Sequence, residues 1–271
     1  MKDIQYEHLA AAGGGLAHRY GDRVHLLSTP YAMSALTRAC SPDSVQPEVN
    51  HLVASLYDHL LGNVASTILR QHQVETPTRM REFTDKGVYS GSCIDRSQRI
   101  VVVDIARAGI LPSHRFYEGL HHIVDAQNIR QDHVVASRTT NTTGQVTGVT
   151  LDGSKIGGSI ADAAVIFPDP MAATGSSLSG VIEHYKNSVD GDAAVMAAVH
   201  LIVTPEYLKR MTTQFPDLHI FAIRLDRGLS NEDVLATVPG TRWDEEFGLN
   251  DTQYIVPGAG GVGEVLNNAW I

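Results

Sequence analysis

Short apolar runs alternate with helical patterns over most of the chain. Each run is rich in Val, Ile or Ala, which is typical of strands that are buried on both faces of a sheet. The runs cover 99–106, 133–138, 163–168, 193–203 and 219–225. After the third run, apolar residues from Leu178 to Tyr185 recur at the i, i+3, i+4 and i+7 positions of a helix. Strands that alternate with helices predict an α/β fold with a mainly parallel, doubly wound sheet.

Helical spacing also dominates the N-terminal region. Apolar residues recur at helical spacing between Glu48 and Gln71, after a break at 41–47. We therefore expect residues 1–72 to form N-terminal helices. Glycines mark turns between Val74 and Asp95, which predicts a short hairpin there. The segment 139–160 is rich in Thr and Gly, and we expect it to form an exposed, flexible β-arm.

Length and charge narrow the class of protein. The 271 residues are enough for one α/β domain, and we expect 1–271 to form a single domain. The net charge of -9 and the pI near 5.8 argue against a surface for nucleic acid or membrane, which would normally be basic. No segment has the pattern of a signal peptide or of a membrane span. We expect a cytoplasmic protein with no nucleic-acid partner and no membrane partner.

The chain is organised around the stretch 163–178. Two prolines interrupt its apolar run, small residues follow, and then a helix begins that Ser176 or Ser177 is suited to cap. The first-turn amides of a helix lack intrahelical partners and carry partial positive charge, so this arrangement can bind an anion such as phosphate. Asp169 would lie at the carboxyl end of the strand, where open α/β sheets place their ligands.

Several motifs resemble the uracil phosphoribosyltransferase family, in that family's order. The string Asp169-Pro-Met-Ala-Ala-Thr-Gly-Ser-Ser resembles the family's loop for phosphoribosyl pyrophosphate (PRPP), Asp-Pro-Met-Leu-Ala-Thr-Gly-Gly-Ser. The string Arg107-Ala-Gly-Ile-Leu resembles its Arg-Ala-Gly-Leu loop, and Arg138 matches an Arg that reaches PRPP. Asp226-Arg-Gly-Leu resembles Asp-Gln-Gly-Leu. The resemblance implies a type I phosphoribosyltransferase fold, with 99–228 as the PRPP-binding core.

The resemblance also implies roles for individual residues. Asp169, Arg107 and Arg138 would be catalytic. Mg²⁺ would be the cofactor, carried in with PRPP and in reach of Asp169, and we expect no other metal site. The implied PRPP-binding residues are Arg107, Ala108, Gly109, Arg138, Asp169, Pro170, Met171, Ala172, Ala173, Thr174, Gly175, Ser176 and Ser177.

The C-terminal segment 251–271 resembles the family's base-binding loop and would form a small hood. Its string Tyr254-Ile-Val-Pro-Gly-Ala-Gly-Gly-Val-Gly-Glu resembles Tyr-Ile-Ile-Pro-Gly-Leu-Gly-Asp-Ala-Gly-Asp. Gly261 stands where the family has an Asp beside the base, and Glu264 replaces the later Asp. Either Glu264 compensates from a turn away, or the contact with base or sugar has changed. The implied base-binding residues are Tyr254, Ile255, Val256, Gly258, Gly260, Gly261 and Val262.

The segment 229–250 precedes that loop and carries no motif of the family. It contains five acidic residues, and we expect a solvated insertion there. A lid or a partner surface are the alternatives for this segment.

The resemblance implies transfer of the 5-phosphoribosyl group from PRPP to uracil, giving UMP and pyrophosphate in pyrimidine salvage. It also implies a homodimer or a higher homo-oligomer. Gly261 keeps another base open, such as a modified pyrimidine or an azole. A regulatory, RNA-binding relative is a further alternative, although the acidic balance of the chain speaks against it.

Overall fold

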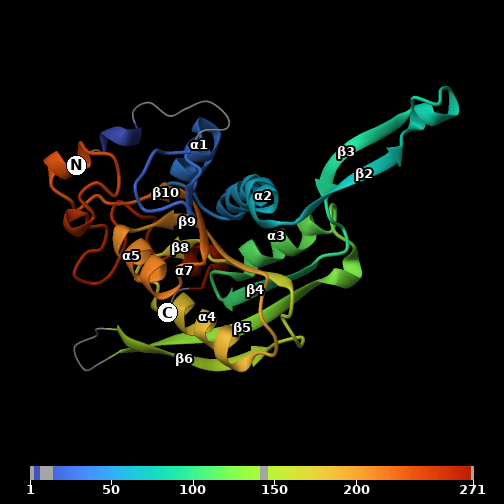
Figure 1. Ribbon diagram of the computed structural model, residues 1–271. Coiled ribbons are helices and arrows are strands. Elements are labelled where there is room, and N and C mark those ends of the chain that lie inside the picture. The colour runs from blue at the N-terminus through green and yellow to red at the C-terminus, as the bar shows by residue number, and fades with distance from the viewer. Residues whose placement is uncertain (1–2, 7–14, 141–145, 270–271) are drawn as a thin grey trace.

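A computed structural model describes residues 3–6, 15–140 and 146–269 (Figure 1). Within these residues, eight strands form one sheet in the order β1-β10-β9-β7-β4-β5-β6, with β8 paired to β9. The strands are β1 (Val24–Leu26), β4 (Arg99–Ala106), β5 (Ile129–Thr140), β6 (Val146–Lys155), β7 (Ala163–Pro168), β8 (Met171–Ala172), β9 (Val195–Val203) and β10 (His219–Leu225).

Every pairing in this sheet is parallel except that of β5 with β6, which is antiparallel. The helices are α1 (Pro30–Ala39), α2 (Glu48–Ile68), α3 (Ile110–Leu120), α4 (Ser176–Ser188), α5 (Pro205–Gln214), α6 (Glu232–Leu235) and α7 (Val262–Asn267), with 3-10 turns at Ile4–Tyr6, Arg79–Glu82, Ala126–Asn128 and Trp243–Glu245. No described helix has both the length and the apolar character needed to cross a bilayer.

The core has two layers because side chains alternate across the strands. On β4, Ile100 and Val102 are buried in the cluster that also holds the apolar faces of α1, α2 and α3. Val101 and Val103 are buried in the cluster formed with α4 and α5. Helices therefore cover both faces of a mainly parallel sheet, which confirms the predicted doubly wound α/β fold.

The N-terminal region differs from the prediction of helices throughout 1–72. Helix α2 ends at Ile68, and Gln71 already belongs to a strand. Val24–Leu26 forms the edge strand β1, parallel to β10, and the prediction of helix was wrong there. Three residues are too few for either the helical or the strand period to appear in a sequence.

The predicted hairpin after α2 is confirmed and is longer than expected. Strand β2 (Gln71–Pro77) pairs antiparallel with β3 (Val88–Ile94), and the pair projects from the body of the molecule (Figure 1). Its tip exposes Met80 and Phe83. The second predicted arm is formed by β5 and β6, although its residues 141–145 lie outside the described part.

The segment 229–250 is only partly the solvated insertion that its charge predicted, because four of its five acidic residues are exposed but Glu246 is buried. Glu246 is 2% exposed and Val234 and Leu235 are buried. The fully buried Arg227 donates to Glu246 Oε1 at 2.8 Å and to the backbone carbonyls of Val234, Leu235 and Thr237. An acidic residue that pairs with a buried Arg contributes to the core, and this pairing is invisible in a count of charges.

Candidate active site

Three loops meet at the carboxyl end of the parallel strands. They follow β4, β7 and β10, and they surround a cavity of about 480 Å³. Open α/β sheets bind ligands at this edge, because the loops there leave neighbouring strands on the same side. The cavity is lined by Ile105, Ala106, Arg107, Ala108, Ala136, Asp169, Met171, Ala173, Ser177, Thr252, Gln253, Tyr254, Ile255, Gly260, Gly261, Val262, Gly263 and Glu264.

The loop after β7 leads directly into the N-terminus of α4. Gly175 is the N-cap residue, with φ of 78°, so the predicted cap at Ser176 or Ser177 was wrong by one or two positions. A Cβ at Gly175 would lie 3.0 Å from Tyr207 Cδ2, and its positive φ disfavours any L side chain. Glycine therefore lets the chain turn tightly into α4, where the Ser176 amide donates to Thr174 Oγ1 at 3.4 Å and the other first-turn amides can bind an anion.

Polar side chains at this turn bind one another. Thr174 Oγ1 and Ser176 Oγ lie 3.0 Å apart, and Arg210 of α5 donates to Ser176 Oγ. Arg210 was missed from the sequence, because the packing of α5 beside α4 brings it to the loop. The guanidinium adds positive charge to a helix N-terminus that already favours an anion.

The loop after β4 packs closely against the loop after β7. A Cβ at Gly109 would lie 2.7 Å from the Ile105 carbonyl oxygen and 3.2 Å from that of Pro168, so only glycine fits. Arg107 is partly exposed at the cavity and lies 3.5 Å from Glu264, measured from Nη2 to Oε1. This long ion pair connects the loop after β4 to the C-terminal loop.

Glu264 also fills the space beside Gly261. A Cβ at Gly261 would lie 2.5 Å from Glu264 Oε2, closer than atoms can approach. The carboxylate of Glu264 thus stands where a side chain of residue 261 would begin.

A buried ion pair holds the C-terminal loop. Arg224 Nε donates to Asp226 Oδ1 at 2.6 Å, and the two side chains are 10% and 1% exposed. Asp226 Oδ2 accepts from the Gly258 amide at 2.8 Å, while Arg224 Nη2 donates to the Gly258 carbonyl at 2.9 Å. Burial lowers the pKa of Arg224, but the hydrogen bond and charge of Asp226 outweigh it and leave that pKa raised. The sequence analysis did not predict that Arg224 and Asp226 hold the C-terminal loop. Their signal in the sequence was two opposite charges, two positions apart, where the apolar run 219–225 ends.

The cavity brings together residues from each of the predicted sets. The predicted residues that line it are Arg107, Ala108, Asp169, Met171, Ala173 and Ser177 of the PRPP-binding set and Tyr254, Ile255, Gly260, Gly261 and Val262 of the base-binding set. The predicted residues that do not line it are Gly109, Pro170, Ala172, Thr174, Gly175, Ser176, Val256 and Gly258. Arg138 belongs to β5, and its side chain lies outside the described part of the structure.

Asp169 and Glu264 are the acidic residues that line the cavity. In the described part of the chain, no cluster of three or more His, Cys, Asp or Glu side chains could hold a metal ion. Mg²⁺ is bound in many enzymes through one or two carboxylates together with waters and substrate phosphates. The residues present fit a Mg²⁺ ion of that kind, held mainly by its substrate.

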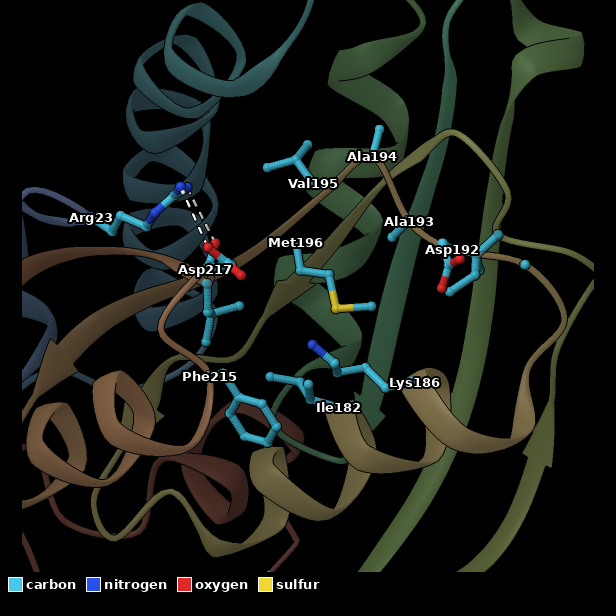
Figure 2. Close-up of a pocket in the computed structure, with 13 residues that line it drawn as sticks. Arg23, Ile182, Lys186, Asp192, Ala193, Ala194, Val195, Met196, Phe215 and Asp217 are labelled. Carbon is cyan, nitrogen blue, oxygen red and sulfur yellow. Dashed lines mark hydrogen bonds and ion pairs between the residues drawn. The ribbon is translucent and has the colours of Figure 1, made fainter.

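A second cavity, of about 340 Å³, lies at the opposite end of β9 (Figure 2). Val195 and Met196 line it at the start of that strand, and Arg23 and Asp217 form an ion pair of 3.6 Å at its wall. None of the three loops described above contributes to its lining. Its amino-end position makes it a poor candidate for the active site of an α/β fold.

Comparison with known proteins finds relatives over most of the chain. The family model described as uracil phosphoribosyltransferase matches residues 26–242. A uracil phosphoribosyltransferase of Pyrococcus furiosus is 26% identical over 231 residues, which are 85% of this chain and 91% of that protein. One of Acidovorax ebreus is 25% identical over 242 residues, 89% of this chain and 96% of that protein. A solved structure from Aquifex aeolicus, 24% identical, covers 90% of this chain and 97% of its own with a TM-score of 0.65, and it supports the fold.

The extent of the family match is informative. It contains both loops that follow β4 and β7, and it enters the segment that was expected to be an insertion. It ends at residue 242 and leaves the C-terminal loop outside.

Proposed function

We propose that this chain, which belongs to the uracil phosphoribosyltransferase family, transfers the 5-phosphoribosyl group of PRPP to uracil, giving UMP and pyrophosphate. Its family membership makes it a pentosyltransferase that acts on PRPP and a base. The observation that carries the finer proposal is the convergence of Arg107, Asp169 and the Gly260–Val262 turn on one cavity. These elements supply, in turn, a cation, a carboxylate and a bare backbone surface for a flat base.

The phosphate groups of PRPP fit the two loops of the sheet. The 5′-phosphate would bind at the N-terminus of α4, where amides, the Thr174 hydroxyl and Arg210 gather. The pyrophosphate would bind at Arg107 and the amides of Ala108 and Gly109. Arg138 stays a predicted pyrophosphate ligand on the basis of the motif alone.

Asp169 would stabilise the reacting ribose. The C1–O bond to pyrophosphate breaks as N1 of the base attacks C1 and gives up its proton to the leaving pyrophosphate or to solvent, and positive charge develops on the sugar. A carboxylate near the ribose hydroxyls opposes that charge, so catalysis comes from position and preorganised electrostatics without a covalent intermediate. When bound with PRPP, Mg²⁺ would neutralise charge on the leaving pyrophosphate, with Asp169 and Glu264 as the protein carboxylates in reach.

The base would lie against the backbone of the C-terminal loop. Gly260 has φ of 68°, and a Cβ there would meet nothing within 4 Å, so the turn presents amides and carbonyls rather than side chains. Backbone donors and acceptors can match the two carbonyls and the N3–H group of uracil, while N1 faces C1 of the ribose. Glu264 would take over the role of the carboxylate that the family places at position 261.

One observation favours a second candidate acceptor, a pyrimidine with an apolar substituent. Met171, Gly260 and Val262 also line a neighbouring, mainly apolar cavity of about 450 Å³ between α1, α2 and the C-terminal loop. An apolar substituent on the base that reached past these three residues into the neighbouring cavity would be removed from water. Faster turnover of a 5-alkylated pyrimidine than of uracil would establish this alternative.

We also propose a homo-oligomer. The projecting β2–β3 hairpin leaves Phe83 77% exposed and Met80 54% exposed, and exposed apolar groups that project from a domain are typical of contact surfaces. A single monomer mass in light scattering across a wide range of concentrations would refute it. Cytoplasmic location and a role in pyrimidine salvage remain predictions from the resemblance.

Formation of UMP from PRPP, Mg²⁺ and uracil tests the proposed function. The nucleotide product is identified by mass, and pyrophosphate release gives the rate. We expect UMP in equal amount to pyrophosphate, and neither product from the Asp169→Asn variant at a comparable rate. Binding of PRPP without any turnover of uracil would reject uracil as the acceptor.

A further inference from the structure

A buried histidine lies behind Asp169. His200, on β9, is 1% exposed. Its Nδ1 lies 2.6 Å from the backbone carbonyl oxygen of Asp169, and its Nε2 lies 2.6 Å from the hydroxyl of Tyr207 on α5. Neither His200 nor Tyr207 lines the cavity, and neither belongs to a motif that resembles the family.

The direction of these hydrogen bonds follows from their chemistry. A carbonyl oxygen can only accept, so Nδ1–H of His200 donates to Asp169. Burial lowers the pKa of His200 to about 4, and the ring is therefore neutral near pH 7. Its Nε2 then carries a lone pair and accepts from the Tyr207 hydroxyl, whose pKa burial raises well above the ordinary value. The relay runs from Tyr207 through His200 to Asp169.

The same helix also supports the far end of the phosphate loop. The ring of Tyr207 packs so closely on Gly175 that a Cβ there would lie 3.0 Å from it. Thr204, the N-cap of α5, donates its hydroxyl to the carbonyl of Ala173 at 2.7 Å and accepts from the Tyr207 amide at 3.0 Å. The loop is thus fixed at Asp169, Ala173 and Gly175 by residues at the junction of β9 and α5.

We propose that His200 and Tyr207 are positioning residues, which lock the backbone of Asp169 and so aim its carboxylate at the ribose of PRPP. The proposal rests on the proposed function, because it assumes that Asp169 faces the reacting sugar. Without His200 the Asp169 carbonyl loses this donor, and the peptide group that follows Asp169 can tilt although the Asp169 amide still donates to the Val199 carbonyl. A buried carbonyl without a partner is costly, so the loop would shift to find one.

Three variants separate positioning from simple packing. His200→Leu keeps the approximate volume and removes both hydrogen bonds. His200→Asn keeps an N–H donor near the Nδ1 position. Tyr207→Phe keeps the ring on Gly175 and removes only the hydroxyl. Tyr185→Phe is the matched control, because Tyr185 is also fully buried and donates to Asp132 at 3.0 Å near the far end of α4.

The readouts are kcat, the KM for PRPP, the PRPP Kd by calorimetry and the melting temperature of each variant. We expect His200→Leu to lower kcat/KM for PRPP about 10- to 100-fold, as for a buried carbonyl that loses its donor. His200→Asn should stay within about threefold of wild type, because its amide replaces that donor. Tyr207→Phe should also stay within about threefold, because it likewise loses only the Tyr207 bond and His200 keeps its donor to Asp169, while Tyr185→Phe should change only the melting temperature.

Two outcomes would overturn the proposal. In the first, His200→Leu lowers the melting temperature but keeps wild-type kcat/KM, so that His200 only fills the core. In the second, His200→Asn loses as much activity as His200→Leu, so that the donor is irrelevant. Failure of the proposed function looks different, because the wild-type protein itself would then neither bind PRPP nor release pyrophosphate.

Discussion

The two halves of the active site are built differently. The phosphate half, formed by the loops after β4 and β7, grows from the centre of the sheet and is supported from behind by β9, where the Asp169 amide donates to the Val199 carbonyl at 3.0 Å. The base half is the C-terminal loop, which leaves the sheet after β10. Arg224 and Asp226 form hydrogen bonds with the backbone of Gly258 in this loop. The family match covers the first half and stops before the second.

Burial shows the same contrast. Ala172 and Ala173 of the phosphate half are 4% and 9% exposed, whereas Tyr254 of the base half is 56% exposed. A loop that is embedded in the core tolerates few changes, while a more exposed loop can change its side chains without loss of the fold. We infer that the phosphate half determines the reaction and that the base half determines the acceptor.

The largest effect should follow from Asp169→Asn. Loss of the carboxylate should lower kcat about 10²- to 10³-fold, because charge on the ribose is then unopposed in the transition state. The rate of pyrophosphate release measures it. Asp192→Asn, in the cavity at the opposite end of β9 (Figure 2), is the control and should keep wild-type kcat. A fall in kcat of less than threefold for Asp169→Asn would show that the Asp169 carboxylate does not stabilise the transition state.

A tenfold effect should follow from Gly175→Ala. The positive φ and the 3.0 Å approach to Tyr207 penalise a Cβ by about 1–2 kcal/mol, and the loop should shift away from the phosphate. We expect the KM for PRPP to rise roughly 10-fold while the KM for the base stays the same. Gly62→Ala is the control, because a Cβ on α2 there would meet nothing within 4 Å. Equal rises in the KM for PRPP and the KM for the base would contradict the separate roles of the two halves.

Gly261→Asp tests the base half. The new Cβ would meet Glu264 Oε2, the end of a flexible side chain, so Glu264 would have to move aside and two carboxylates would then lie close together. We expect kcat/KM for the base to fall about tenfold, through displacement of Glu264 and like-charge repulsion. The double variant Gly261→Asp with Glu264→Asp should recover most of the loss, because the shorter acid vacates the space. No recovery in steady-state assays of the double variant would count against the proposed exchange of carboxylates.

The smallest expected effect is a pH dependence of the free energy of unfolding that comes from His200, which supports the phosphate half. The pKa of His200 is lowered to about 4 in the folded chain, so the unfolded state binds the proton first as the pH falls. His200 is neutral in both the folded and the unfolded chain at pH 7.5. At pH 6 the unfolded chain binds a proton at His200, which should lower the free energy of unfolding by about 1 kcal/mol relative to pH 7.5. Urea unfolding at the two pH values measures it. His200→Asn should show a smaller difference, and an equal difference would assign the pH dependence to other groups.

The sequence was informative wherever a pattern repeats or a motif is local. The apolar runs predicted the central strands, and the small residues after β7 predicted a helix N-terminus with an open turn. The resemblance to the family gave the three loops that meet at the cavity.

Contacts between distant segments could not be predicted. The His200 relay needs β9 to lie beside β7, and the Glu264–Arg107 pair needs the C-terminal loop to fold back over β4. Glu246 is buried against Arg227, so the acidic composition of 229–250 predicted its exposed residues but not this part of the core. Each of these depends on tertiary packing, which has no periodic signal.

Turnover of a panel of bases with PRPP and Mg²⁺, each nucleotide identified by mass, tests the division of labour between the halves most directly. The panel contains uracil, 5-alkylated uracils, cytosine and an azole, and is run on the wild-type chain and on Gly261→Asp. We predict that uracil gives the highest kcat/KM in the wild type, and that Gly261→Asp changes the values for the bases while PRPP still binds. Unchanged base values together with lost PRPP binding in Gly261→Asp would contradict the division.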